Sequence, residues 1–148
     1  MIITSSAFDD GAAIPKKFTC DGGDMNPELL LQYVPPEAKC LALIVHDPDA
    51  PVAGGWTHWT VWNLDPRISI IKEESVPPGA VEGSPSAGTA GYRGPCPPPG
   101  APHHYHFHLY ALDAFLDLPE GAAVPALREA IANHMVAEAD LVGTYARA

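Results

Sequence analysis

The sequence is poor in basic residues and in cysteine, and it lacks any long apolar run. Lys and Arg total 8 of 148 residues against 18 Asp and Glu, which gives a formal net charge of −10. Because proteins bind nucleic acid largely by neutralising phosphates with Lys and Arg, this balance argues against a nucleic-acid partner. No stretch approaches the roughly 18 consecutive apolar residues that span a bilayer, and the N-terminus lacks the basic and apolar regions of a signal peptide. We therefore expect a cytoplasmic protein without a membrane span.

Cysteine is limited to Cys20, Cys40 and Cys96. An odd number at irregular spacing fits neither a disulfide framework nor a CxxC metal site, so we expect three reduced thiols. Cys96 lies in a proline-rich loop, where a thiol is either reactive or simply a small residue. We expect the second.

Apolar residues make up 47% of the sequence, which also contains 17 Pro and 13 Gly. A chain of this length and composition fits one domain over residues 1–148. Apolar, β-branched and aromatic runs predict strands at residues 41–45, 57–64 and 105–112. A helix is predicted at residues 125–139, where Leu127, Ile131 and Met135 recur at helical spacing. These elements indicate a mainly antiparallel β fold with one flanking C-terminal helix.

Two aspartates follow the first predicted strand in the segment HDPDAP, residues 46–51. Asp47 and Asp49 are fixed by the neighbouring prolines, although Asp beside Pro is also ordinary turn chemistry. On the next predicted strand, the period of two puts His58 on one face with Thr60 and Trp62. A buried imidazole needs a hydrogen-bond partner, and the aspartates could provide one. His58 is thus either a polar core residue or part of a site.

Residues 77–102 are dense in Pro, Gly, Ser and Ala, and we expect a long ordered loop there. In its segment GYRGPCPPPG, residues 91–100, glycines permit close approach to a ligand and prolines stiffen the chain. Such a loop can direct main-chain N–H groups at an anion.

The segment HHYHFH, residues 103–108, contains four histidines. On a strand, His104, His106 and His108 share one face, while His103 shares the other with Tyr105 and Phe107. Alternate histidines can ligate zinc with a third ligand from a neighbouring strand. Residues at i and i+4 of a strand lie about 13 Å apart, however, so at most two adjacent histidines can share an ion. We predict no metal and no cofactor, and keep a metal-assisted hydrolase as the alternative.

Several of these segments together resemble the phosphatidylethanolamine-binding protein family, which includes Raf kinase inhibitor proteins, and most closely its bacterial and archaeal YbhB/YbcL branch. They are FTCDGGDMNPELLLQYVP, DPDAP followed by GGWTHWTVWNL, GYRGPCPPPG with HHY, and the C-terminal AEADLVGTYAR. The resemblance implies a large central antiparallel sheet, a smaller sheet packed against it and a flanking helix. We also expect a cis-proline.

The resemblance further implies a surface pocket that binds anions, typically a phosphate group. Carried over to this sequence, the ligand-binding residues are Asp47, Asp49, His58, Gly94, Pro95, His103 and Tyr105. One departure is His104, which stands where the family usually has Arg and so removes a permanent positive charge.

Two functions for the pocket therefore stay open, beside a structural or interaction protein in which the pocket is vestigial. The first is a non-catalytic module that recognises phosphorylated small molecules, headgroups or peptides, with a possible protein partner and a possible homodimer. In it, Asp47 and Asp49 orient His58 and His103 and raise the pKa of each ring, so that the rings donate to the anion. The alternative is a hydrolase in which Asp47 or His58 acts as general base together with the histidine-rich strand.

Overall fold

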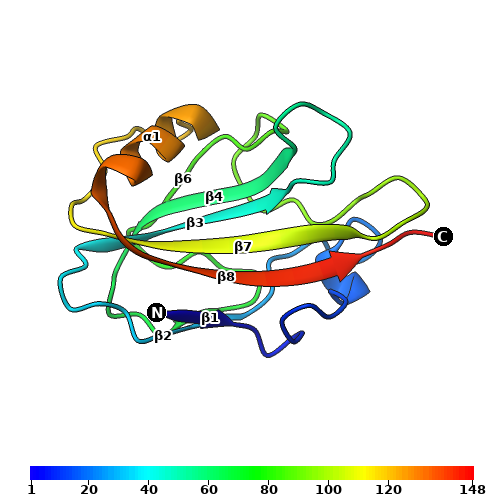
Figure 1. The fold of residues 1–148 in the computed structure, drawn as a ribbon, viewed down its shortest axis with the longest axis horizontal. Coiled ribbons are helices and arrows are strands. Elements are labelled where there is room, and N and C mark those ends of the chain that lie inside the picture. Colours follow the sequence, from blue (N-terminus) through cyan, green and yellow to red (C-terminus); the bar gives the residue numbers. More distant parts are fainter.

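The computed structural model describes residues 1–148 and contains two antiparallel sheets and one α-helix (Figure 1). The larger sheet has the strand order β6-β4-β3-β7-β8 and the smaller has the order β1-β2-β5. The large-sheet strands are β3 (Cys40–Asp47), β4 (Trp56–Leu64), β6 (Val81–Glu82), β7 (His103–Leu112) and β8 (Met135–Tyr145). The small-sheet strands are β1 (Ile2–Thr4), β2 (Leu29–Gln32) and β5 (Ile70–Ile71), and a short 3-10 turn, η1, spans Lys16–Phe18. The predicted mainly β class is confirmed.

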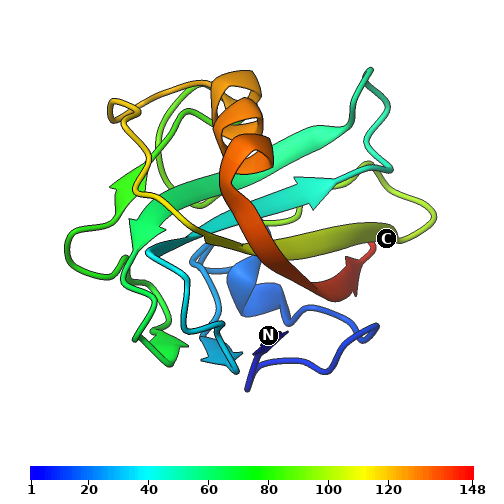
Figure 2. The same cartoon turned by 60° about the vertical axis from the view of Figure 1, so that its left-hand side comes forward.

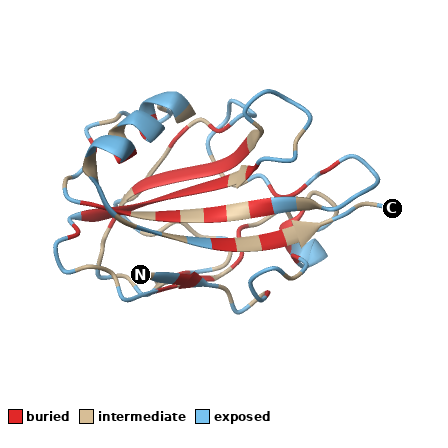
Figure 3. Ribbon diagram, in the orientation of Figure 1, coloured by how far each residue is buried: buried red, intermediate tan, exposed pale blue.

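The large sheet is covered on both faces (Figures 2 and 3). One face packs against the small sheet in an apolar cluster that includes Leu43, Phe107 and Ile3. The opposite face packs against helix α1 (Val124–His134), which buries Leu127 and Ile131. Because both faces of β3 are buried, this strand is a continuous apolar run and does not alternate with polar residues. Of the three predicted strands, all are present, and each is extended by one to three residues at one or both ends.

The predicted helix is wrong in its last five residues. Helix α1 ends at His134, whose carbonyl accepts a hydrogen bond from the Asp113 N–H at 2.9 Å while its ring Nδ1 lies 2.9 Å from Asp113 Oδ1. From Met135 the chain becomes strand β8, and Met135 itself is 44% exposed. The residues after it alternate between outward and inward positions, and this period of two prevails because β7 offers a ladder of partners along its whole length.

The long loop at residues 77–102 is present, interrupted only by the two-residue strand β6. The structure contains no cis peptide bond, so the expected cis-proline is not found. The expectation of three reduced thiols is also wrong, because Cys20 and Cys96 form a disulfide with their Cα atoms 5.5 Å apart, and only the buried Cys40 is free. The number and spacing of the three cysteines did not reveal this disulfide, because the fold brings together two cysteines that are 76 residues apart in sequence. No helix has the length and apolar character needed to cross a membrane.

Candidate functional site

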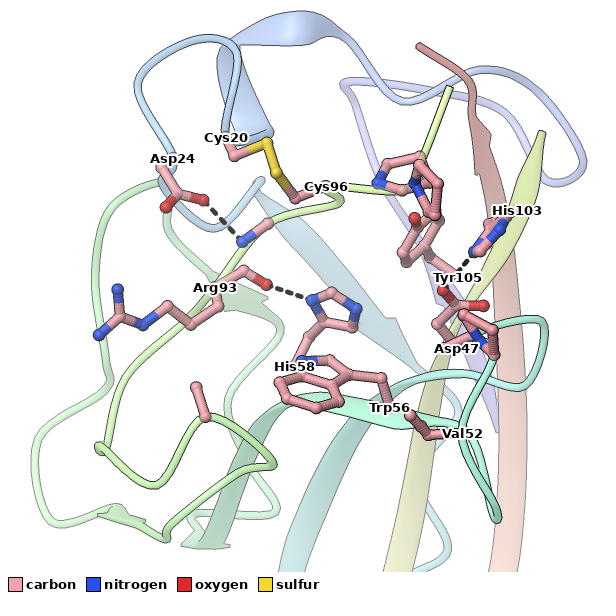
Figure 4. A pocket seen from close by; sticks show the side chains of 16 residues that line it. Cys20, Asp24, Asp47, Val52, Trp56, His58, Arg93, Cys96, His103 and Tyr105 are labelled. Atoms are coloured by element: carbon pink, nitrogen blue, oxygen red, sulfur yellow. Dashed lines mark hydrogen bonds and ion pairs between the residues drawn. A yellow bond between two sulfur atoms is a disulfide. The ribbon is translucent and has the colours of Figure 1, made fainter. Parts of the chain in front are cut away.

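A cavity of about 570 Å³ opens where β3 ends and where β4 and β7 begin (Figure 4). Its walls come from four segments that are far apart in the sequence, within residues 20–24, 47–58, 87–98 and 103–105. The polar side chains that β3, β4 and β7 contribute to it are Asp47, His58, His103 and Tyr105. Of the seven residues predicted for the site, these four and Gly94 line the cavity.

Asp47, the last residue of β3, forms the floor of this arrangement, with only 4% of its side chain exposed. Its Oδ1 accepts a hydrogen bond from the Asp49 N–H at 2.8 Å, and its Oδ2 accepts one from His103 Nδ1 at 2.7 Å. A carboxylate bonded to one ring nitrogen fixes both the orientation and the tautomer of the imidazole. The predicted pairing between an aspartate and His103 is therefore present.

A β-bulge brings His58 into the cavity. Val45 pairs with Trp59 but His46 pairs with Thr57, so His58 is the extra residue of β4. An extra residue shifts the alternation of a strand. His58 consequently leaves the face that holds Trp62 and turns toward the cavity, so its predicted place on the Trp62 face is wrong.

The predicted partner and charge of His58 are also corrected. Its Nδ1 donates to the Arg93 carbonyl at 2.8 Å and not to a carboxylate, while the Arg93 side chain extends away from the cavity (Figure 4). The side chain of His58 is buried, and burial lowers its pKa more than this hydrogen bond and the nearby Asp47 raise it. At neutral pH, His58 is thus a neutral ring with a lone pair on Nε2.

Tyr105 lies between the two histidines. Its ring meets His58 edge to face at a centroid distance of 5.3 Å and stacks on His103 at 6.5 Å. Burial, followed by the charges of Asp47 and Asp49, raises the pKa of the phenol, so it stays a neutral O–H donor. No protein group hydrogen-bonds to this hydroxyl, which leaves it free for a molecule in the cavity.

The glycine-rich loop forms the opposite wall and is attached to the N-terminal segment at several points. The Gly94 N–H donates to Asp24 Oδ1 at 2.6 Å, and the Cys20 N–H donates to the Pro95 carbonyl at 3.1 Å. The Cys20–Cys96 disulfide closes the same wall. Gly94 must lack a side chain because a Cβ there would overlap the Phe18 carbonyl oxygen.

Two predicted site residues lie outside the cavity. Asp49 Oδ2 accepts hydrogen bonds from the His104 N–H at 2.8 Å and from the His104 ring at 2.7 Å. These bonds from His104 lower the pKa of Asp49. Pro95 is buried behind the wall, where it contributes its carbonyl oxygen. Of the two adjacent histidines, His103 lines the cavity and His104 does not.

The hydrolase alternative needs two groups of residues that the structure places on opposite faces of the large sheet. Asp47 and His58 face the cavity, whereas His106 and His108 lie on the other face of β7, as the alternation of β7 requires. The backbone layer of the sheet stands between the two groups, so they cannot act on one substrate.

Sequence reasoning missed Asp24, Trp56 and the disulfide as parts of the wall. Asp24 lies in the quoted segment FTCDGGDMNP, and its positive φ of 54° marks a special backbone position that becomes visible only in the structure. Trp56 begins β4 opposite Asp47, and this pairing follows from the register of the sheet.

Fold and site together define a two-sheet β protein with a cavity that holds several polar side chains at one end of its central sheet. The family model for phosphatidylethanolamine-binding protein matches residues 4–146. A UPF0098 protein of Methanothermobacter thermautotrophicus is 46% identical over 152 residues, which cover 99% of each chain. The chain belongs to the phosphatidylethanolamine-binding protein family.

Two crystal structures agree with this assignment. The phosphatidylethanolamine-binding protein homologue CT736 from Chlamydia trachomatis superposes with a TM-score of 0.93 at 45% identity, over 99% of this chain and 97% of that chain. YbcL of E. coli, described as a member of the mammalian PEBP family, superposes with a TM-score of 0.94 at 30% identity, over 99% of this chain and 98% of that chain.

Proposed function

We propose that the protein binds a small anionic group in this cavity, most simply the phosphate of a small molecule, lipid headgroup or peptide. The observation that carries the proposal is the hydrogen-bond arrangement of the carboxylates. Both oxygens of Asp47 and one oxygen of Asp24 already accept hydrogen bonds from the protein. The groups left for a ligand are the Tyr105 hydroxyl and the second ring nitrogens of His58 and His103. On a molecule with a net charge of −10, the Tyr105 hydroxyl is thus a neutral hydrogen-bond donor at this point, and a second ring nitrogen becomes a donor only when its ring is protonated.

His58 favours an anion that carries a proton. Because its Nδ1–H is held by the Arg93 carbonyl, the neutral ring presents Nε2 as an acceptor. Hydrogen phosphate, or the monoanion of a phosphomonoester, has a P–O–H group that can donate to this nitrogen, whereas sulfate has none at neutral pH. Protonation of His58 at acid pH turns Nε2 into a donor, so affinity for either anion rises as the pH falls to the pKa of this ring, which burial lowers.

The rest of the ligand is expected to contact an apolar rim. Val52 lines the cavity and is 50% exposed, and Trp56 lines it beside Val52 (Figure 4). Two or three charge-assisted hydrogen bonds, at about 1.5–3 kcal/mol each, do little more than offset the free energy of association. We therefore expect phosphate alone to bind with a Kd near the millimolar range, and a ligand that also covers the apolar rim to bind more tightly.

The test is a titration with inorganic phosphate, O-phosphoethanolamine and sulfate at neutral pH, followed by the backbone amide shifts of the cavity residues. We expect the two phosphates to saturate and sulfate to bind more weakly. Tyr105→Phe should weaken phosphate binding about tenfold, which corresponds to one lost hydrogen bond. His104→Gln is the matched control, because His104 is adjacent in sequence but lies outside the cavity, and it should bind normally. The proposal fails if none of the three anions saturates, or if His104→Gln and Tyr105→Phe weaken binding equally.

A protein partner, a homodimer and a cytoplasmic location remain predictions. Sedimentation equilibrium over a range of protein concentrations measures the second of these directly.

A further inference from the structure

A second polar cluster lies on the opposite face of the large sheet and has no part in the proposed anion site. It consists of His106 and His108 on β7 and Asp140 on the neighbouring strand β8, which pairs directly with His108. His106 Nδ1 lies 2.9 Å from Asp140 Oδ2, and His108 Nδ1 lies 3.1 Å from Asp140 Oδ1. The two rings are stacked with an interplanar angle of 18°. Two imidazoles are thus directed at one carboxylate.

We infer that His106, His108 and Asp140 form a binding site for a divalent transition-metal ion. One ligand atom from each of the three lies within 4.8 Å of the others. Three donors about 2.0–2.2 Å from a tetrahedral ion lie about 3.3–3.6 Å from one another, so the ion requires side-chain rotations that adjust the present distances. The strands themselves do not move, because β7 and β8 are paired along their full length.

The donor set indicates the class of ion. Two imidazole nitrogens and one carboxylate oxygen suit Zn²⁺, Co²⁺, Ni²⁺ or Cu²⁺, whereas Mg²⁺ and Ca²⁺ prefer sites made only of oxygen. Three protein ligands leave coordination positions for water, and the side chains of the cluster are partly exposed, at 27% for His106, 31% for His108 and 39% for Asp140.

A histidine ring that carries one proton keeps that proton when the metal ion binds. In the metal-free state, the Nδ1–H of His106 donates to Asp140 Oδ2, and His108 Nδ1 lies 3.1 Å from Asp140 Oδ1. When the ion takes both Nδ1 lone pairs, each ring changes to the tautomer protonated at Nε2, and solvent transfers that proton. One metal ion thereby replaces these two contacts with three coordinate bonds. His46 on β3 pairs with His106 in the sheet, and its Nδ1 is already engaged with Thr57 Oγ1 at 3.1 Å, so it is a neighbour of the cluster and not a ligand in this arrangement.

The site is tested by titrating Co²⁺ and then Zn²⁺ into the full chain after treatment with EDTA. We expect one saturable Co²⁺ ion with visible absorption bands, displaced by an equivalent of Zn²⁺. The nitrogen resonances of two histidine rings should shift together on Zn²⁺ addition. His108→Gln and Asp140→Asn should each weaken binding by at least about tenfold, a loss reported even for outer partners of metal ligands. Circular dichroism verifies that these partly exposed variants keep the fold.

The matched control is His134→Gln. His134 pairs with Asp113 through an Nδ1–Oδ1 distance of 2.9 Å, as His106 does with Asp140, but it has no second imidazole beside it. This variant should bind Co²⁺ like the unchanged protein. Absence of a saturable ion, binding that survives in His108→Gln, or loss of binding in His134→Gln would each overturn the inference. Phosphate binding in the cavity should be unchanged in all of these variants, so the experiments test the metal site and the anion site independently.

Discussion

Removing the Cys20–Cys96 disulfide should lower the free energy of unfolding by about 4.5 kcal/mol. The two cysteines are 76 residues apart, and the chain-entropy relation for a loop of that length gives about 15 cal/mol/K, or about 4.5 kcal/mol at 25 °C. The native state should change much less, because neighbouring hydrogen bonds keep the wall in place. The Gly94 N–H still donates to Asp24 and the Tyr92 hydroxyl still donates to the Phe18 carbonyl.

The measurement is urea unfolding of the protein with and without a phosphine reductant. The reduced protein should unfold at lower urea concentration, and its m-value should be larger because the unfolded chain is no longer cross-linked. Since typical domains have a total stability of about 5–15 kcal/mol, the reduced protein can remain folded but has little reserve. Phosphate affinity of the folded reduced protein should change less than about threefold, which is within 1 kcal/mol.

The control is the Cys20→Ser, Cys96→Ser double variant. It should match the reduced protein in stability, and the reductant should have no effect on it, since Cys40 forms no disulfide. A loss below about 1 kcal/mol would refute the reasoning that the cross-link acts on the unfolded chain. A collapse of phosphate binding in the folded reduced protein would show that the hydrogen bonds alone do not hold the wall.

Three further predictions concern the cavity wall. Burial lowers the pKa of His58, so below the ordinary value of about 6.5 the folded chain binds fewer protons than the unfolded chain, and the stability contributed by the neutral ring is lost as the pH falls toward the folded pKa. Urea unfolding between about pH 8 and pH 5 should show this decline in the free energy of unfolding. A His58→Gln variant whose stability declines equally would contradict the prediction. Gly94→Ala should lower stability by about 1–3 kcal/mol in thermal or urea unfolding because the new Cβ overlaps the Phe18 carbonyl oxygen; an unchanged midpoint would show that the wall yields freely. Tyr92→Phe removes the donor to that same carbonyl, at 2.9 Å, and should lower stability by about 1 kcal/mol, whereas no loss would mean that water replaces the hydroxyl.

The strands that carry the site were accessible to sequence reasoning because their patterns are long. Strands β3, β4 and β7 have 8, 9 and 10 residues, and their apolar and aromatic runs exceed what a loop would contain. The small sheet was expected from the family resemblance but not from the residue pattern, because β1, β2 and β5 have only 3, 4 and 2 residues, too few to show any period. Strand β8 was assigned in part to the helix because its first residues fit both periods, and only the partner strand decides between them.

In the site, too, a regular strand pattern was predictable from the sequence, whereas features that depend on neighbouring strands were not. Alternation along β7 correctly separated His103 and Tyr105 from the other histidines, since a regular strand has a fixed period of two. Alternation failed for His58 because a bulge breaks that period, and whether a strand bulges depends on its neighbour. The pKa direction of His58 was also wrong, because the amount of burial, which has the largest effect, is a property of the folded chain.

The pairing of β7 with β3 couples the two polar regions of the molecule. Consecutive side chains of β7 leave the backbone on opposite sides, so a slip of one residue in this pairing would turn His104 and His106 toward the cavity and remove His103 and Tyr105 from it. Neither cluster would survive such a slip, and seven ladder pairs between β3 and β7 oppose it. Point substitutions behave in the opposite way, because a residue on one side of β7 can change without touching the other. The strand thus allows each side to vary independently while keeping both in alignment.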